Sequence, residues 1–188
     1  LAPLQSDPRF AAAMFSPDDF ANPFVEKVRV IHEWVGEAKG DQFSWIARGI
    51  ADVDGDGVRE VVTSAPTHGA GGQASGPGRV YLYSGRTGML LWSVTGQAQE
   101  GLGTGLEGAG DVDRDGAADV IAGAPGGERA YVYSGRDGRQ LRVLAPPQAE
   151  PGYGGAASGV GDQNGDGHAD VVVGAPGAPG AAATKGRA

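Results

Sequence analysis

The chain has 188 residues, enough for one ordinary domain, and carries a formal net charge of −8 at pH 7. That charge argues against a nucleic-acid-binding protein, because binding to phosphates depends on Lys and Arg. With 35 glycines, 12 prolines and no cysteine, the composition favours short strands joined by tight turns and excludes disulfides and thiolate metal sites.

The N-terminal segment, residues 1–27, holds four prolines and several apolar residues, with one short helix expected near residues 8–15. Such a segment is either a linker or a strap across an open edge of the domain that follows. The first strand is predicted at residues 28–35. The residues after it, 36–43, align with residues 96–102, which follow a later predicted strand.

From residue 43 onward, one order of segments occurs three times. Each copy starts with a glycine-rich, mildly apolar run, continues into an acidic loop, and enters a short β-branched run. That run reads as a buried strand and ends at a small residue followed by Ala and Pro. Proline ends the strand because it lacks the N–H that a ladder needs. The copies span residues 43–66, 102–125 and 153–176.

Two further strands complete the first two copies. Residues 79–88 match residues 129–138: aliphatic and aromatic residues alternate and then enter a glycine-bounded hairpin turn. A fourth strand follows at 89–95 and at 140–144, and it is expected to be half exposed at an outer edge. Four antiparallel strands in a period of this length are the unit of a β-propeller blade. The predicted fold is therefore all-β, a partial β-propeller of four-stranded antiparallel blades.

The acidic loop of each copy points to metal binding. It places oxygen-bearing side chains at positions 1, 3, 5 and 9 of a nine-residue segment, with glycine at position 6. Ca²⁺ takes about six to eight oxygen ligands, and the glycine permits the bend that brings position 9 and the position 7 carbonyl toward the ion. We therefore expect up to three Ca²⁺ ions in hairpin loops. The expected ligands are Asp52, Asp54, Asp56, the Val58 carbonyl and Glu60; Asp111, Asp113, Asp115, the Ala117 carbonyl and Asp119; and Asp162, Asn164, Asp166, the His168 carbonyl and Asp170.

Two competing motifs are set aside. An EF-hand needs a bidentate Glu at position 12, where this chain has Thr63, Ala122 and Val173, and a helix after the loop, where it has a predicted strand. The run from Gly103 to Gly108 fits the dinucleotide pattern, but it leads into an acidic loop instead of a helix. Glycines in a tightly packed inner strand explain it.

Aromatic and histidine side chains give weaker signals. Trp34, Trp45 and Trp92 are expected to pack in the core instead of forming a platform for sugars. The ring of His168 is expected to point to solvent, because this residue offers its carbonyl to the metal. No serine lies in a nucleophile elbow, and nearly all paired carboxylates belong to the loops, so we expect no enzymatic activity.

The whole pattern resembles FG-GAP repeats, the blades of integrin α-subunit propellers and of many bacterial surface proteins. The likeness covers residues 28–176 and is strongest at the acidic loops and at the Gly-Ala-Pro stops. It implies Ca²⁺ ligands at the same loop positions. The Phe-Gly signature appears as Phe43-Ser44, Leu102-Gly103 and Tyr153-Gly154. Because Glu60 is longer than the usual Asp and Asn164 is neutral, the second loop is expected to bind tightest.

The resemblance also predicts the domain organisation. Propellers of this family close with seven blades, whereas residues 28–176 supply two full blades plus parts of two others. Residues 177–188 form a low-complexity tail. An open arc exposes sheet faces and edges, so self-association or pairing with the missing blades is expected.

By resemblance, the chain is a calcium-binding structural or recognition module for cell-surface adhesion or protein interaction, with an unknown protein or carbohydrate as its ligand. The alternative is an accessory propeller segment of a secreted hydrolase or polysaccharide lyase. Ca²⁺ modules with dissociation constants of about 10⁻⁴–10⁻³ M are typical of extracellular proteins, which favours an extracellular or cell-surface location. No stretch approaches the ~20 apolar residues of a membrane span.

Overall fold

The computed structural model describes residues 29–71 and 75–177. The chain divides into two compact units, Leu1–Glu33 and Trp34–Ala188, and all the described strands belong to the second. The predicted linker or strap at 1–27, its short helix, and residues 178–188 of the predicted tail lie outside the described residues. None of the helices in the described ranges has the length and apolar character that crossing a membrane requires.

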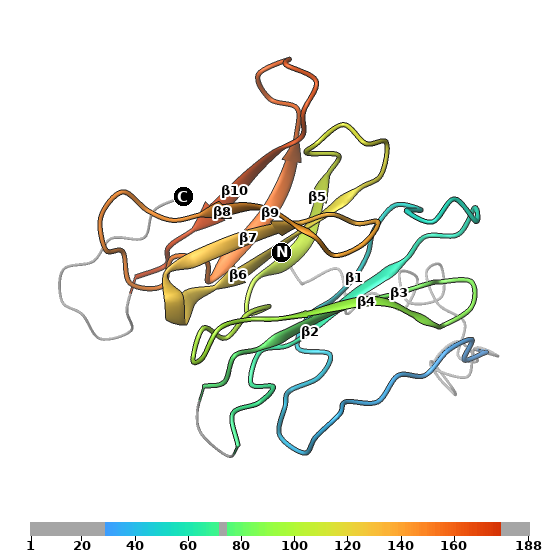
Figure 1. Ribbon diagram of the computed structural model, residues 1–188, viewed down its shortest axis with the longest axis horizontal. Coiled ribbons are helices and arrows are strands. Elements are labelled where there is room, and N and C mark those ends of the chain that lie inside the picture. Colours follow the sequence, from blue (N-terminus) through green and yellow to red (C-terminus); the bar gives the residue numbers. More distant parts are fainter. Residues whose placement is uncertain (1–28, 72–74, 178–188) are drawn as a thin grey trace, which may run out of the picture. The chain divides into compact units, whose positions relative to one another are not determined.

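The strands of the second unit form three antiparallel sheets, in which neighbours in the chain are neighbours in the sheet (Figure 1). The first sheet contains β1 (Ala47–Gly49), β2 (Val61–Ala65), β3 (Arg79–Tyr83) and β4 (Leu90–Thr95). The second contains β5 (Leu106–Gly110), β6 (Asp119–Ala124), β7 (Arg129–Tyr133) and β8 (Gln140–Leu144), with a short 3₁₀ turn, η2 (Pro125–Gly127), after β6. The third contains β9 (Ala156–Gly161) and β10 (Asp170–Gly174).

The three sheets follow one another as blades. Strand β5, the first of its sheet, contacts β1 and β9, the first strands of the sheets on either side. Such contacts between the inner strands of successive four-stranded sheets are typical of blades arranged around a common axis. The prediction of an all-β, partial β-propeller with four-stranded antiparallel blades is confirmed.

Glycines allow the inner strands to approach closely. A Cβ atom added to Gly159 on β9 would lie 2.4 Å from the carbonyl oxygen of Gly108 on β5, far inside contact distance. The glycine-rich runs before the acidic loops therefore permit the packing of one blade against the next. This agrees with the packing explanation of the Gly103–Gly108 pattern.

Burial follows the order of strands within a blade. β6 is buried along its whole length and β2 along most of it, whereas β4 and β8 are largely half exposed, as predicted for outer strands. Trp92 on β4 is 8% exposed and donates its indole N–H to the Gly135 carbonyl at 2.8 Å. Its predicted place in the core is confirmed.

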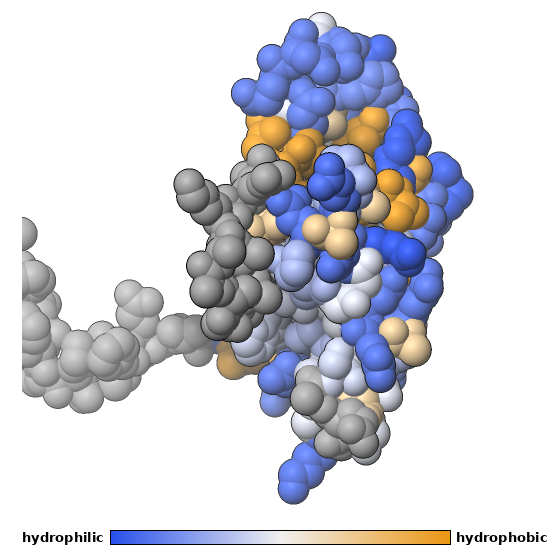
Figure 2. Space-filling view, turned by 90° about the vertical axis from the view of Figure 1, so that its left-hand side faces the viewer, coloured by the Kyte–Doolittle hydropathy of each residue, from blue (hydrophilic) through white to orange (hydrophobic). Residues whose placement is uncertain are grey.

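The third sheet is more open than the other two. Only two strands form it within the described residues, and the predicted buried strand β10 is mostly of intermediate exposure. Val160 and Val172 are 41% and 37% exposed. Figure 2 shows one side of the surface, where hydrophobic residues gather between hydrophilic ones.

The strand predicted at residues 28–35 is wrong, because the described residues 29–35 lie in no strand. Instead, Trp34 packs its ring on Tyr83, with centroids 4.9 Å apart, and donates its indole N–H to the Gly88 carbonyl at 2.8 Å. Trp34 therefore packs on the first blade at half burial.

Candidate metal centres

Each acidic loop joins the first two strands of its sheet. The loops lie between β1 and β2, between β5 and β6, and between β9 and β10 (Figure 1). The residue at position 9 stands at or just before the start of the second strand, so the rigid ladder holds one end of the loop. A strand follows each loop where an EF-hand would have its exit helix.

The three loops share one pattern of hydrogen bonds. The position 1 carboxylate accepts from the backbone N–H of position 6, and the position 9 carboxylate accepts from the N–H of position 2. The first contact measures 2.7 Å in Gly57–Asp52, 3.0 Å in Gly116–Asp111 and 2.7 Å in Gly167–Asp162. The second measures 2.8 Å in Val53–Glu60, Val112–Asp119 and Gln163–Asp170. The nine-residue repeat thus encodes one backbone conformation.

The first loop brings its carboxylates together. Asp52, Asp54, Asp56 and Glu60 each offer an oxygen atom, and these four atoms all lie within 4.8 Å of one another. Like charges held this closely repel unless a cation compensates them. All four carboxylates predicted for the first site therefore converge.

Glu60 is the most informative member of this group. Its side chain is fully buried; one oxygen, Oε2, accepts from the Val53 N–H, and the other, Oε1, has no hydrogen-bond partner among the described residues. Burial raises the pKa of Glu60, and the charges of Asp54 and Asp52 add to this shift. A buried carboxylate oxygen without a partner is costly, and a hard cation would satisfy it. The donor set thus fits Ca²⁺.

The second loop groups three carboxylates. Oxygens of Asp111, Asp113 and Asp115 lie within 4.8 Å of one another, but Asp119 is outside the group. Both oxygens of Asp119 accept from backbone N–H groups, one from Val112 at 2.8 Å and one from Gly135 at 3.1 Å. Burial raises the pKa of Asp119 to about 6. In this loop, backbone donors hold the position 9 carboxylate, which stands apart from the other three in the absence of a metal.

The third loop has the same backbone pattern but a looser set of side chains. Its three carboxylates, Asp162, Asp166 and Asp170, form no comparable group among the described residues. The loop residues before His168 are exposed, and the Asn164 side-chain oxygen accepts from the Asp166 N–H at 2.8 Å. The N–H of His168 lowers the pKa of Asp166, much as the N–H of Gly57 lowers that of Asp52. Backbone donors thus favour the charged form of these aspartates.

Arginines near the loops were missed at the sequence level. In each complete blade, an Arg from the turn between the third and fourth strands pairs with the Asp at position 5. Arg86 Nε lies 3.2 Å from Asp56 Oδ2, and Arg136 Nε lies 2.9 Å from Asp115 Oδ2. The repeated sequence Ser-Gly-Arg-x-Gly at residues 84–88 and 134–138 is the signal that identifies both.

The second and third loops contact each other. His168 Nδ1 donates to the Val112 carbonyl at 2.7 Å, Arg114 Nε donates to the Gly167 carbonyl at 2.9 Å, and the Ala169 N–H donates to the Asp111 carbonyl at 2.9 Å. The prediction that the His168 ring points to solvent is wrong, because the neighbouring blade brings an acceptor within reach. Adjacent loops are therefore linked across the boundary between blades.

Comparison with known proteins agrees with this architecture. The family described as FG-GAP-like repeat matches residues 111–173, and the family described as FG-GAP repeat matches residues 49–83. The first range contains the second and third acidic loops, and the second range contains the first acidic loop with β2 and β3.

Similar proteins include integrin alpha chains. Integrin alpha-PS5 of Drosophila melanogaster is 32% identical over 172 residues, covering 81% of this chain and 17% of the relative. Integrin alpha-PS3 of the same species is 31% identical, covering 81% of this chain and 15% of the relative, and integrin alpha-2 of Bos taurus is 29% identical, covering 79% and 14%. The chain thus spans less than a fifth of the length of these relatives. With its repeated blades and acidic hairpin loops, it belongs to the FG-GAP repeat family of the integrin alpha type.

Proposed function

We propose that this chain is a calcium-binding FG-GAP β-propeller segment in which Ca²⁺ stabilises the hairpin between the first two strands of each blade. The observation that carries the proposal is the buried Glu60 carboxylate, which has one oxygen without a partner among the described residues and belongs to a group of four converging carboxylates. Binding a cation there offsets the repulsion between the acids and the desolvation of Glu60. The free energy of binding then adds to the free energy of folding.

The proposed ligands are the side chains at positions 1, 3, 5 and 9 and the carbonyl at position 7 of each loop. The sequence ranks the second loop as tightest because it contains four aspartates. The geometry favours the first loop instead, since four carboxylates converge there and Asp119 stands outside the second group. We propose that affinity falls in the order of the first, second and third loops, because the third loop has no such group among the described residues.

We further propose that residues 28–176 serve as a recognition segment outside the cell, with no catalytic role of their own. Two features support this. The similar proteins are integrin alpha chains, and Ca²⁺ modules with dissociation constants of about 10⁻⁴–10⁻³ M are typical of extracellular proteins. In this role the metal loops hold the blades in shape, while surfaces elsewhere on the blades contact the partner.

The test is thermal unfolding followed by far-UV circular dichroism in EDTA, in Ca²⁺ from micromolar to millimolar, and in Mg²⁺ at the same concentrations. We expect a rise in melting temperature that is selective for Ca²⁺, because Ca²⁺ tolerates irregular oxygen coordination, whereas Mg²⁺ demands a near-ideal octahedron and dehydrates reluctantly. Asp137→Asn is the matched control, since Asp137 lies in a turn outside the loops. An unchanged melting temperature in Ca²⁺ would contradict the proposal.

A further inference from the structure

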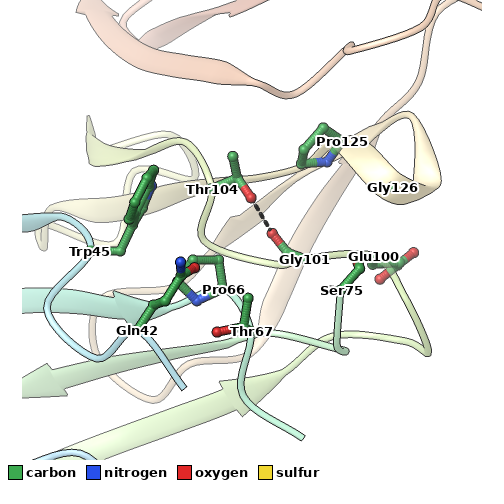
Figure 3. Close-up of a pocket in the computed structure, with 10 residues that line it drawn as sticks. All are labelled: Gln42, Trp45, Pro66, Thr67, Ser75, Glu100, Gly101, Thr104, Pro125 and Gly126. Atoms are coloured by element: carbon green, nitrogen blue, oxygen red, sulfur yellow. Dashed lines mark hydrogen bonds between the residues drawn. The ribbon is translucent and has the colours of Figure 1, made fainter. Parts of the chain in front are cut away.

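A cavity of about 210 Å³ lies between the first and second blades (Figure 3). Its lining comes from the segment before β1, from the connections after β2 and β6, and from the connection between β4 and β5. The acidic loops follow β1 and precede β2, so the cavity is at the opposite end of these strands. Both sheets beside it are complete four-stranded blades, so the cavity does not result from an open blade edge.

An exposed aromatic ring forms one side of the cavity. Trp45 is 55% exposed, and Figure 3 shows it across the cavity from Thr104 and Gly101. The prediction that Trp45 packs in the core is therefore wrong: the chain before β1 turns its ring outward. A large apolar ring left in solvent beside a concave surface is a feature of binding sites.

The backbone beside Trp45 is held in an unusual conformation. Gln42 and Ser44 have φ angles of 55° and 66°, in the left-handed region that glycine favours. The matching residues of the second blade are Gly101 and Gly103, with φ angles of 62° and 91°. The first blade thus keeps this turn without the residue type that adopts it most easily. Such local strain is often found beside ligand sites.

The three hydroxyls of the lining present hydrogen-bond acceptors to the cavity. Each of the three hydroxyls donates its proton to a carbonyl: Thr67 to Gly40 at 2.8 Å, Ser75 to Gln99 at 3.1 Å, and Thr104 to Gly101 at 2.7 Å. Their oxygen lone pairs remain for a ligand. These hydroxyls suit a ligand with several hydrogen-bond donors, and the Gln42 side-chain amide adds a donor and an acceptor for the same ligand.

The backbone N–H groups of the lining point to the same selectivity. The N–H of Gly101 donates to the Gly76 carbonyl at 2.9 Å, and the N–H of Gly126 donates to the Glu100 carbonyl at 3.0 Å. Neither is left to bind a phosphate, a sulfate or a carboxylate.

The carboxylate in the lining is already compensated. Glu100 is 4% exposed, and its Oε1 accepts from the Tyr131 hydroxyl at 2.8 Å and from Arg129 at 3.3 Å. Its Oε2 accepts from the Gln97 N–H at 2.8 Å. Because Arg129 balances the charge, the cavity has no excess negative charge to attract a cation. A polyhydroxyl compound is an uncharged ligand with several donors and acceptors that fits this lining.

We propose that this cavity binds one uncharged pyranose ring of a glycan, with its C–H face against Trp45 and its hydroxyls donating to Thr67, Ser75 and Thr104. An apolar ring face beside a few placed acceptors matches the two faces of a sugar. The proposal names a ligand for the recognition role proposed above and rests on that role. It does not depend on the metal loops, which lie at the other end of the strands.

The experiment is saturation-transfer difference NMR of the whole chain in millimolar Ca²⁺, with methyl pyranosides of glucose, galactose, mannose and N-acetylglucosamine as probes. We expect at least one glycoside to receive saturation at its ring protons, with a dissociation constant on the order of 1 mM, as suits a ligand of this size. Trp45→Ala should abolish the signal and Thr104→Val should weaken binding about tenfold, because a ligand hydroxyl then loses its acceptor.

The controls separate this site from the rest of the protein. Trp34→Phe removes an indole that packs on Tyr83, and it should leave sugar binding unchanged. Circular dichroism melting of each variant with and without Ca²⁺ shows whether the fold and its metal response persist. Loss of binding in Trp45→Ala with an unchanged melting profile supports the cavity as the site. Sugar binding without any Ca²⁺ response would refute the calcium role alone.

Three results would overturn the proposal: no glycoside receives saturation, a glycoside binds equally well to Trp45→Ala, or only charged probes bind. The charged probes are N-acetyl-lysine methylamide, for a cationic ligand, and sialic acid, for an anionic sugar. Binding of the lysine probe in place of the neutral glycosides would mean that Glu100 acts as an uncompensated charge.

Discussion

The sharpest prediction concerns Glu60→Gln, which should have opposite effects with and without Ca²⁺. In the metal-free protein, the substitution removes a buried charge, relieves an oxygen that has no hydrogen-bond partner among the described residues, and reduces repulsion with Asp52 and Asp54. The Gln carbonyl can keep the bond from the Val53 N–H, and its amide can donate to the neighbouring carboxylates. With Ca²⁺ present, the same change removes a charged ligand from the first site.

The expected change in the free energy of unfolding of Glu60→Gln differs between the metal-free and the Ca²⁺-bound protein. Leaving a buried polar group without a partner costs about 1–3 kcal/mol, so the metal-free variant should gain roughly 1–2 kcal/mol in free energy of unfolding. For a chain of this size that corresponds to a melting temperature about 3–6 °C higher. At a Ca²⁺ concentration about 100 times the dissociation constant, an intact site contributes about 2.7 kcal/mol, and most of this contribution should be lost in the variant.

The assay is urea unfolding and thermal melting in EDTA and in saturating Ca²⁺, with isothermal titration calorimetry to count the ions. Glu107→Gln is the matched control, because Glu107 lies on β5 outside the loops and pairs with Arg48 at 3.0 Å near the surface. It should change stability by less than about 0.5–1 kcal/mol in either buffer. A Glu60→Gln variant that is less stable in EDTA, or that binds as many Ca²⁺ ions as the parent, would refute the reasoning.

The remaining predictions test packing, backbone strain and pH. Gly103→Ala should lower the free energy of unfolding in urea by about 3 kcal/mol or more, because the added Cβ would lie 2.5 Å from the Ser64 Cβ at a φ of 91°. Gly40 has a φ of 84° but no described atom within 4 Å of such a Cβ, so Gly40→Ala should cost only about 1–2 kcal/mol. Equal costs for the two variants would contradict this explanation. Ser44→Gly should raise stability by about 0.5–1 kcal/mol by relieving its positive φ, and a loss would mean that this turn is not strained. In EDTA, the free energy of unfolding should fall as the pH rises through about 6, because the folded protein raises the pKa of Asp119 above its unfolded value and so binds a proton that stabilises it only at lower pH. Asp119→Asn should flatten this part of the stability profile. An unchanged slope in the variant would contradict the role of Asp119.

The contacts between loops bear on how metal binding affects the whole segment. The second and third loops are joined by His168, Arg114 and Ala169, so ordering one loop restricts its neighbour. Arg86 and Arg136 connect the first and second loops to the outer hairpins of their own blades. If the proposed sites bind Ca²⁺, these hydrogen bonds and ion pairs are the contacts through which ordering of one loop would restrain its blade and its neighbour.

The sequence alone was enough to predict the repeat, the order of strands and the conformation of the loops. These features depend on residues close together in the chain: alternation sets the strands, and the bonds within each nine-residue loop join residues at most seven positions apart, as in Val112–Asp119. The pattern therefore predicted the loop conformation in all three copies. It also predicted β8 with its observed bounds, and β4 to within one residue.

Only the tertiary structure decided which of these residues share an environment. Glu60 and Asp119 occupy the same loop position. The N–H of Gly135, from a turn outside the loop, satisfies Asp119, whereas one oxygen of Glu60 has no partner in the part of the chain that the structure describes. Likewise, residues 29–35 form no strand, β10 is half exposed, and Trp45 faces a cavity, because each depends on whether another strand or blade covers it. Local geometry is encoded within a few residues, whereas burial and long-range partners arise only when the blades pack together.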